Sequence, residues 1–250
     1  MTELAYLADG PAGYVRSFRA RITALPPGGV VLDRTYFYPG GGGQPPDRGG
    51  LRVAGVEFSV VDVARSGPAV VHRLRRGRTG GSALAIGAEV EGTLDWDRRY
   101  GHMRLHTGQH LLSALVFART GQRTAAARLQ GRSASIVLEG PLPAGEEAAL
   151  ARAFEEAVAR ARPVTIRHVP RSEWESRPSA PRSGLVPLAP HVDPVRIVEI
   201  EAEDACPCGG THLASTGEIG PIRLEVGDGD VARTRLGFTL VGPGDAAPPV

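Results

Sequence analysis

The sequence contains two pairs of residues whose types could bind a metal ion. Within each pair the residues are four positions apart. His106 and His110 form the first pair, and Cys208 and His212 form the second. Three imidazole nitrogens and one thiolate make a complete tetrahedral ligand set for Zn²⁺. The pairs lie 98 residues apart along the chain (208 − 110), so only a fold can bring them together. We therefore predict one zinc site formed by all four residues.

The ligand set leaves the role of the metal open. A site with four protein ligands can simply link two segments, because a catalytic zinc usually keeps one position for water or substrate. A metalloprotease is disfavoured, since that chemistry needs a Glu beside the first His, and residues 107–109 are Thr, Gly and Gln. None of these is an efficient base at neutral pH. His102 and Cys206 are spare residues of ligand type.

A run of four glycines is the second feature with chemical potential. Residues 35–49 read TYFYPGGGGQPPDRG. Glycine allows the backbone to approach a ligand closely and leaves its N–H groups free to point at a phosphate or an oxyanion. The alternative is an ordinary tight loop between two strands.

A helix is expected to position the first pair. Asp97 is the predicted N-cap of a helix that runs to about Arg119 and is ended by Gly121. Residues four apart lie along one face of a helix, so the two histidines of the pair face the same way. A second helix is predicted over residues 145–162, with Pro163 stopping it.

Strands are expected on either side of these helices. Polar and apolar residues roughly alternate over residues 15–24, and Gly and Pro separate the short β-rich runs that follow, at 30–33, 52–64, 69–74 and 88–94. Several short strands at this spacing favour a small barrel. Beyond the helices, strands are predicted at 195–200, about 219–226 and 231–241, and the Cys/His pair falls in a Gly-rich loop. We predict a β-barrel domain over residues 1–95, a zinc-binding α+β domain over 96–241, a loop at 77–83 and a disordered tail at 242–250.

Composition narrows the class of protein. No stretch of the 250 residues approaches the roughly 20 apolar residues of a membrane span, and no signal peptide is visible. The only two cysteines flank Pro207, which indicates a reducing, cytoplasmic setting. The net charge is only +2, yet residues 96–135 hold 7 Arg and one acid, a local +6. An anionic partner near the metal is therefore expected.

Together these residues resemble the AlaX family, free-standing relatives of the editing domain of alanyl-tRNA synthetase. The resemblance rests on residues 35–49, 95–115 and 195–220, and the order of Gly-rich loop, His pair and Cys-Gly-Gly-Thr-His is highly specific. Similar metal motifs occur in the editing domain of threonyl-tRNA synthetase. The resemblance implies an α+β fold, in which a small, translation-factor-like β-barrel precedes an editing domain with an antiparallel sheet, helices and a zinc site.

The resemblance also implies roles for individual residues. Positions that match the metal ligands of the family are His106, His110, Cys208 and His212, with Zn²⁺ as the cofactor. Gln44 and Thr35 match positions that line the editing pocket and are the catalytic candidates. Substrate-binding candidates are Gly41, Gly42 and Gly43 in the loop, and Arg98, Arg99 and Arg104, which we expect to contact tRNA phosphates.

The activity that the resemblance implies is hydrolysis of wrongly charged tRNA(Ala), chiefly Ser-tRNA(Ala) and sometimes Gly-tRNA(Ala). We expect a cytoplasmic zinc-dependent aminoacyl-tRNA hydrolase that acts in trans, without a membrane and as a monomer. Thr35 is the candidate for contacting the serine hydroxyl, and the alternative for this β-branched residue is strand packing. Two other functions stay open: a non-catalytic zinc-stapled tRNA-binding module, and an editing-type hydrolase for another aminoacyl-tRNA.

Overall fold

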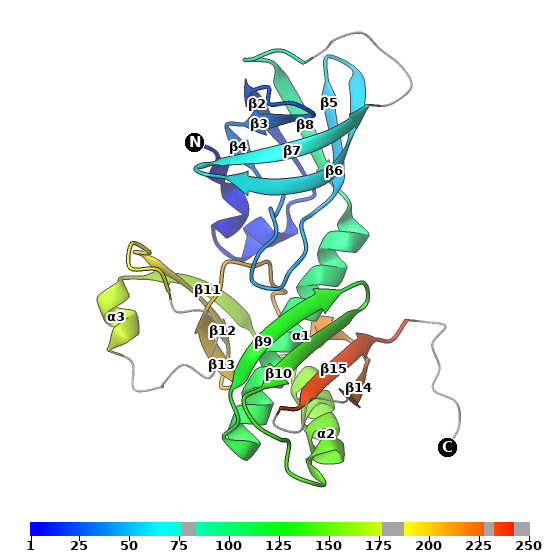
Figure 1. The fold of residues 1–250 in the computed structure, drawn as a ribbon, viewed down its shortest axis with the longest axis vertical. Coiled ribbons are helices and arrows are strands. Elements are labelled where there is room, and N and C mark those ends of the chain that lie inside the picture. The colour runs from blue at the N-terminus through cyan, green and yellow to red at the C-terminus, as the bar shows by residue number, and fades with distance from the viewer. Residues whose placement is uncertain (77–83, 177–187, 228–232, 243–250) are drawn as a thin grey trace. The chain divides into compact units, whose positions relative to one another are not determined.

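The chain divides into two compact units, Met1–His102 (unit 1) and Met103–Val250 (unit 2). This computed structural model describes residues 1–76, 84–176, 188–227 and 233–242, and Figure 1 traces its elements. The division falls inside helix α1 (Trp96–Thr120), whereas the predicted domain boundary precedes this helix, between residues 95 and 96. The predicted loop at 77–83 lies outside the described residues, and so does the predicted tail after Gly242.

Unit 1 contains a closed barrel with the strand order β2-β3-β7-β6-β5-β8. Its strands are β2 (Ser17–Ala24), β3 (Gly29–Leu32), β5 (Gly49–Val53), β6 (Val56–Ser66), β7 (Ala69–Arg76) and β8 (Glu89–Leu94). Two short strands, β1 (Glu3–Leu4) and β4 (Arg34–Thr35), pair in parallel beside the 3₁₀ turns Ala5–Leu7 and Gly10–Tyr14. Burial alternates along β2, with Phe18, Ala20 and Ile22 facing the core. This is the pattern of a strand with one buried face, and the predicted barrel is confirmed.

Helix α1 begins two residues earlier than the sequence indicated. The side chain of Asp95 accepts a hydrogen bond from the backbone N–H of Arg98 at 3.2 Å, so Asp95 is the N-cap. The prediction of Asp97 as the cap is wrong, because Asp97 lies inside the first turn. Its negative charge still suits the positive end of the helix. At the other end Gly121 has φ +71, the left-handed conformation that commonly follows a helix.

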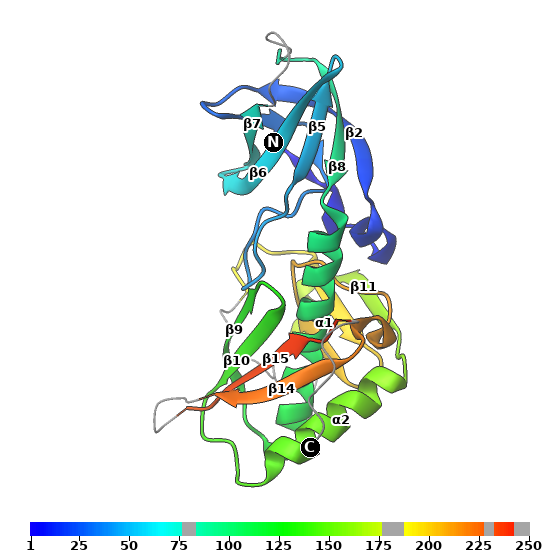
Figure 2. The ribbon, with the colours of Figure 1, turned by 90° about the vertical axis from the view of Figure 1, so that its right-hand side faces the viewer.

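Unit 2 places α1 between two sheets (Figures 1 and 2). The four-stranded sheet has the order β14-β15-β10-β9, and the three-stranded sheet has the order β11-β12-β13. The elements are β9 (Thr124–Gln130), β10 (Ser133–Leu138), α2 (Glu146–Ala159), β11 (Val164–Val169), α3 (Arg171–Glu175), β12 (Val195–Ile200), β13 (Asp204–Pro207), a 3₁₀ turn (Thr216–Ile219), β14 (Ile222–Gly227) and β15 (Arg235–Leu240). None of the described helices is long and apolar enough to cross a membrane.

Close packing holds α1 against the four-stranded sheet. Gly108 is the contact point, since a Cβ added there would lie 2.7 Å from the ring of Phe238 on β15. Phe238 packs in turn on Phe154 of α2, with ring centroids 5.6 Å apart. Both rings are almost fully buried. A glycine in mid-helix thus allows α1 to approach the sheet closely. This contact fixes the rotation of α1 about its own axis, and therefore the direction in which the face with His106 and His110 points.

Four strands of unit 2 were not predicted. In the β9–β10 hairpin the signal was present, because Ala134, Ile136 and Leu138 alternate with less buried residues after a turn at Gly131 (φ +59). Strands β11 and β13 are short, and neither has such an alternation of apolar residues. The predicted strand at 195–200 is confirmed as β12, and the predicted helix at 145–162 ends earlier, as α2, before Ala161 (φ +48).

Candidate metal centre

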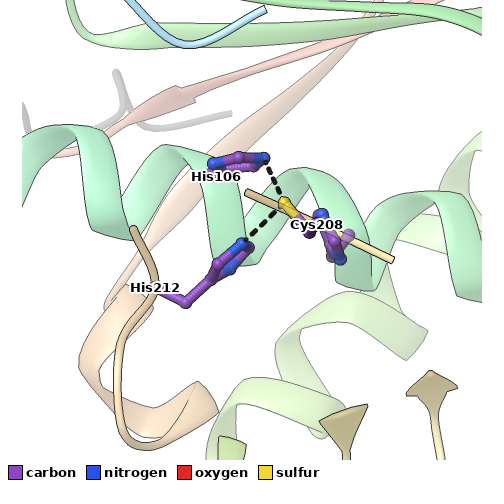
Figure 3. Close-up of side chains that lie close together, drawn as sticks. His106, Cys208 and His212 are labelled. Carbon is purple, nitrogen blue, oxygen red and sulfur yellow. Dashed lines mark hydrogen bonds between the residues drawn. The ribbon is translucent and has the colours of Figure 1, made fainter. Parts of the chain in front are cut away.

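The four residues predicted to share a metal lie together in unit 2. One ligand atom from each of His106, His110, Cys208 and His212 falls within 4.8 Å of the others. The sulfur of Cys208 lies 3.5 Å from Nε2 of His106 and 3.3 Å from Nε2 of His212 (Figure 3). Helix α1 supplies the first two residues, and the loop after β13 supplies the others. The fold therefore joins two motifs that are 98 residues apart (208 − 110).

The donor atoms fit a tetrahedral zinc ion. Bond lengths of about 2.3 Å to sulfur and about 2.0 Å to nitrogen place two such donors about 3.5 Å apart at the tetrahedral angle, close to the observed separations. All three histidines are buried, with exposed fractions of 2% for His106, 6% for His110 and 2% for His212. Three buried imidazoles beside one sulfur form a set that suits zinc better than a hard, oxygen-binding cation.

Strand β12 holds the loop that carries Cys208. The backbone N–H of Cys208 donates to the carbonyl of Arg196 at 3.1 Å, and the Arg196 guanidinium donates to the carbonyl of Cys208. The N–H of Gly210 donates to the Cys208 sulfur at 3.3 Å. The two bonds with Arg196 hold the backbone of Cys208 in place, and the N–H of Gly210 directs the sulfur and favours its thiolate form.

Thr107 orients His212, a role that sequence reasoning missed. Its hydroxyl oxygen accepts from the N–H of Leu213 at 3.0 Å and lies 3.2 Å from Nδ1 of His212. Since Nε2 of His212 faces the sulfur of Cys208, Nδ1 carries the proton and donates it to Thr107 when Nε2 binds a metal. Only the fold reveals this contact, because Thr107 and His212 are distant in the sequence.

Neighbouring charges shift the pKa values of His110, Cys208 and His212 in ways that favour binding of a cation. Burial lowers the pKa of His110, but the electrostatic attraction and hydrogen bonds of the Cys206 and Cys208 sulfur atoms outweigh it and raise that pKa to about 10. Removal from water raises the pKa of Cys208, but His106 and His212 outweigh it and hold that pKa well below its usual range. Burial, followed by the charge of His106, lowers the pKa of His212. Without a metal, the site thus pairs a thiolate with an imidazolium, and a bound cation would replace the proton.

The two spare residues of ligand type differ in their surroundings. His102 is buried, with 4% exposed, and belongs to unit 1. Cys206 lies beside the four candidate ligands, where it forms a second group with His110 and Asp204. Asp204 was not singled out from the sequence, because nothing there placed it next to a histidine.

The glycine run forms a tight turn in unit 1. Gly41 and Gln44 exchange two backbone hydrogen bonds, of 3.1 Å and 2.9 Å, and the Tyr38 hydroxyl donates to the carbonyl of Gly41 at 2.8 Å. All four residues from Gly40 to Gly43 have positive φ, which explains why the loop needs glycine. Residues 41–43 are exposed, while Gln44 is only 2% exposed.

Thr35 is committed to hydrogen bonds inside unit 1. Nδ1 of His72 lies 3.3 Å from the carbonyl of Val30, and a carbonyl can only accept, so Nδ1 carries the proton. Nε2 therefore accepts from the Thr35 hydroxyl at 2.8 Å, while the hydroxyl oxygen accepts from the N–H of Phe37 at 3.1 Å. Thr35 is 0% exposed. Its predicted contact with a substrate hydroxyl stays a prediction.

The three arginines predicted to bind phosphates have distinct environments. Arg98 is partly exposed and donates to the carbonyl of Pro46 at 3.0 Å. Arg104 is also partly exposed and donates to the carbonyl of Ile219 at 2.8 Å. Arg99 is 0% exposed and forms an ion pair with Asp47. Its guanidinium also donates to backbone carbonyls, so Arg99 has a structural role in unit 1, and its predicted contact with a phosphate stays a prediction.

Comparison with known proteins identifies the class to which this barrel and metal group belong. Residues 14–98 match the family described as tRNA synthetases class II (A). Residues 195–235, which include Cys208 and His212, match the threonyl and alanyl tRNA synthetase second additional domain. Unit 2 is thus an editing-type domain of the kind found in those synthetases.

Two relatives match this chain over nearly their whole length. The alanyl-tRNA editing protein AlaX-M of Methanosarcina mazei is 36% identical over 235 residues, 90% of each chain. AlaX-M of Methanosarcina acetivorans is 35% identical over 253 residues, 96% of this chain and 100% of the relative. The alanine–tRNA ligase of Pyrobaculum neutrophilum is 40% identical over 223 residues, 85% of this chain. The chain spans only 24% of that ligase. The chain belongs to the AlaX-M family of alanyl-tRNA editing proteins, and the resemblance seen in the sequence is confirmed.

Proposed function

We propose that this protein is a trans-editing hydrolase that removes a wrong amino acid, serine or glycine, from tRNA(Ala). The observation that carries the proposal is the match to two alanyl-tRNA editing proteins over at least 90% of their length. The buried group of His106, His110, Cys208 and His212 supports it. The proposed partner is tRNA(Ala), and the proposed cofactor is Zn²⁺.

The reaction is hydrolysis of an ester at the 3′ end of the tRNA. A water molecule attacks the carbonyl carbon, the bond from this carbon to the ribose oxygen breaks, and the products are a free amino acid and a tRNA with a free hydroxyl. Hydrogen-bond donors must stabilise the negative oxygen that develops in between. We assign this role to the backbone N–H groups of the exposed Gly42 and Gly43 and to the side chain of Gln44. The two backbone hydrogen bonds between Gly41 and Gln44 hold this loop rigid.

The metal group has a proposed role in positioning. Zinc held by His106, His110, Cys208 and His212 would supply a fixed positive charge that orients or polarises the ester. The protein side of this task is to keep the four donors aimed at one point, which the hydrogen bonds to Thr107 and Gly210 promote. A set of four protein donors favours positioning over activation of water, because it leaves no open coordination position.

The proposed contacts to tRNA are electrostatic. Arg98 and Arg104 are partly exposed and sit on α1, and Arg is well suited to phosphate oxygens. Each donates one N–H to a backbone carbonyl, and this bond holds the guanidinium in place on the helix.

One observation favours the second candidate, a tRNA-binding module without catalysis. The four donors form a complete protein ligand set, as in zinc sites that only link segments. Under this alternative the protein would bind tRNA(Ala) and leave the aminoacyl ester intact.

A deacylation assay separates these functions. The purified protein is incubated with Ser-tRNA(Ala), Gly-tRNA(Ala), Ala-tRNA(Ala) and Ser-tRNA(Thr). We expect Ser-tRNA(Ala) to be hydrolysed at least about tenfold faster than Ala-tRNA(Ala), the effect of roughly one hydrogen bond to the serine hydroxyl. Binding of tRNA(Ala) without deacylation of any substrate would support the binding module instead. Faster hydrolysis of Ser-tRNA(Thr) would indicate a hydrolase for another tRNA.

A further inference from the structure

Strand β13 brings a second set of polar side chains to the metal group. β13 (Asp204–Pro207) pairs antiparallel with β12, with Cys206 opposite Val198. Side chains two residues apart in a strand point to the same face, so Asp204 and Cys206 share one. The backbone bond from the Cys208 N–H to Arg196 continues the pairing. Cys208 is two residues beyond Cys206, so its side chain points to the same face as those of Asp204 and Cys206. All three side chains contact histidines of α1.

The second set contacts the ring of His110. Nδ1 of His110 lies 3.2 Å from Oδ2 of Asp204 and 3.3 Å from the sulfur of Cys206. The sulfur of Cys206 is also 3.6 Å from that carboxylate oxygen. The side chains of His110 and Asp204 are only 7% and 6% exposed. A charge-assisted hydrogen bond shielded from water to this degree is stronger than a neutral one at the surface.

The two nitrogens of His110 thus face different groups. Nδ1 faces Asp204 and Cys206, so Nε2 is the nitrogen left for the group with Cys208. A histidine that binds a metal through one nitrogen usually donates the N–H of the other to a carboxylate or carbonyl, which fixes the tautomer and the ring direction. His212 follows the same rule with a neutral partner, Thr107.

We propose that Asp204 and Cys206 are positioning residues for the metal ligand His110. The Asp204 carboxylate accepts a hydrogen bond from the Nδ1–H of His110. The S–H of Cys206 donates a second hydrogen bond to the same carboxylate oxygen. Together they hold Nε2 in the direction of the other three ligands. This inference rests on the metal-dependent function proposed above, but it concerns metal affinity and can be tested without tRNA.

A second metal ion is the competing explanation of the same distances. Separations of 3.2 to 3.6 Å among His110, Asp204 and Cys206 also suit three donors on one zinc ion, which are about 3.3 to 3.6 Å apart. In that arrangement His110 would bridge two ions, and Cys206 would be a ligand. The number of metal ions per chain and the number of bound sulfurs distinguish the two possibilities.

The test uses Co²⁺ as a spectroscopic substitute for zinc in the full chain. We expect one Co²⁺ per chain and a sulfur-to-cobalt charge-transfer band with the intensity of one thiolate. Cys206→Ser should keep this band and bind Co²⁺ within about threefold of the wild type, while Cys208→Ser should abolish the band.

Asp204→Ala should weaken Co²⁺ binding by about 10- to 100-fold. Asp204→Asn, which keeps an oxygen acceptor, should fall between the wild type and Asp204→Ala. Glu201→Gln is the matched control, because it removes a negative charge from an exposed residue near the same strand.

Several results would overturn the proposal. These are two Co²⁺ ions per chain, loss of half the charge-transfer band in Cys206→Ser, equal Co²⁺ affinity of Asp204→Ala and wild type, or a folded wild type that binds no Co²⁺. If Asp204→Ala does not fold, the Asp204→Asn variant decides through the exchange-protected Nδ1–H proton signal of His110 in the Co²⁺ form. This signal should be present in the wild type and shifted or exchange-broadened in the variant, and an identical signal in both would contradict the proposal. Failure of the deacylation assay alone would reject the proposed function and leave these results standing.

Discussion

Thr35 shows how a residue with a predicted binding role can be part of the internal structure. Its hydroxyl donates to His72 and accepts from Phe37 inside unit 1. Thr35→Val removes both bonds and leaves buried polar groups without them, so we expect the free energy of unfolding to fall by about 1–3 kcal/mol. Thr35→Ser keeps the hydroxyl and should lose less. Denaturant unfolding measures both variants.

The same variants test the predicted substrate contact. Selectivity for Ser-tRNA(Ala) over Ala-tRNA(Ala) is measured under conditions where all variants are folded. If Thr35 contacts the serine hydroxyl, Thr35→Val loses selectivity and Thr35→Ser retains it. Unchanged selectivity in Thr35→Val, together with lower stability, would leave Thr35 with its structural role alone.

His72 predicts how the stability of unit 1 depends on pH. Burial, opposed by the bond to Val30, lowers its pKa from 6.5 to about 4. The unfolded chain therefore binds a proton between these values that the folded chain rejects, so stability falls as pH decreases from 6.5 to about 4. The loss is about 3 kcal/mol for a shift of this size. Above pH 6.5 His72 contributes no pH dependence.

His72→Gln isolates this contribution, because the glutamine amide can both donate and accept a hydrogen bond but does not titrate. Free energies of unfolding are measured from pH 7 to 4 for wild type and variant. We expect the difference between the two curves to change by about 3 kcal/mol over this range. Parallel curves would mean that His72 titrates normally in the folded protein.

At the scale of elements, helix α1 contains two glycines with opposite surroundings. A Cβ at Gly108 would lie 2.7 Å from the ring of Phe238, whereas one at Gly101 would meet nothing within 4 Å. Gly108→Ala should therefore lower the free energy of unfolding by about 1–3 kcal/mol through overpacking. Gly101→Ala should raise it by up to about 1 kcal/mol, since alanine favours helix. Thermal unfolding compares them, and equal effects would contradict the packing of α1 described above.

The elements also show what the sequence alone could and could not predict. The barrel strands other than β5, together with β12 and α1, follow from alternation, glycine and proline positions, and helix periodicity, because each of these signals is local. The predicted run at 52–64 joined β5 and β6, which the turn at Ala54 and Gly55 separates. β13 has no such signal: it is four residues long and contains Pro207. Its existence depends on pairing with β12, and the positions of Asp204 and Cys206 beside His110 depend on β13. The grouping of the four candidate metal ligands was predictable from residue type and spacing, whereas their hydrogen-bond partners required the fold.

The charge of residues 96–135 is a second property that the sequence alone describes incompletely. Residues 96–135 have a local charge of +6, but part of it is neutralised by acids from elsewhere in the chain. Asp47 pairs with Arg99 in the interior, and Glu146 pairs with Arg119. The sequence therefore overestimates the positive surface that this segment presents to a nucleic acid.

At the scale of the whole molecule, the metal group lies entirely within unit 2. Zinc at one hundred times its Kd should stabilise the folded form of that unit by about 2.7 kcal/mol. We expect a chelator to accelerate hydrogen exchange in α1 after residue 103 and in β12, and to leave β2 and β6 of the barrel unchanged. Mass spectrometry of exchanged peptides resolves these segments. Equal acceleration in both units would show that the metal stabilises the chain as a single unit.

The proposed function requires that a metal held by His106, His110, Cys208 and His212 is needed to hydrolyse mischarged tRNA(Ala). The most direct measurement is the rate of Ser-tRNA(Ala) deacylation by the metal-free protein, before and after one equivalent of zinc is added, with Cys208→Ala measured alongside. We predict that the metal-free protein is folded but inactive, that zinc restores its rate, and that the variant stays inactive with zinc. A metal-free protein that deacylates Ser-tRNA(Ala) at the rate of the zinc-loaded protein would contradict the claim.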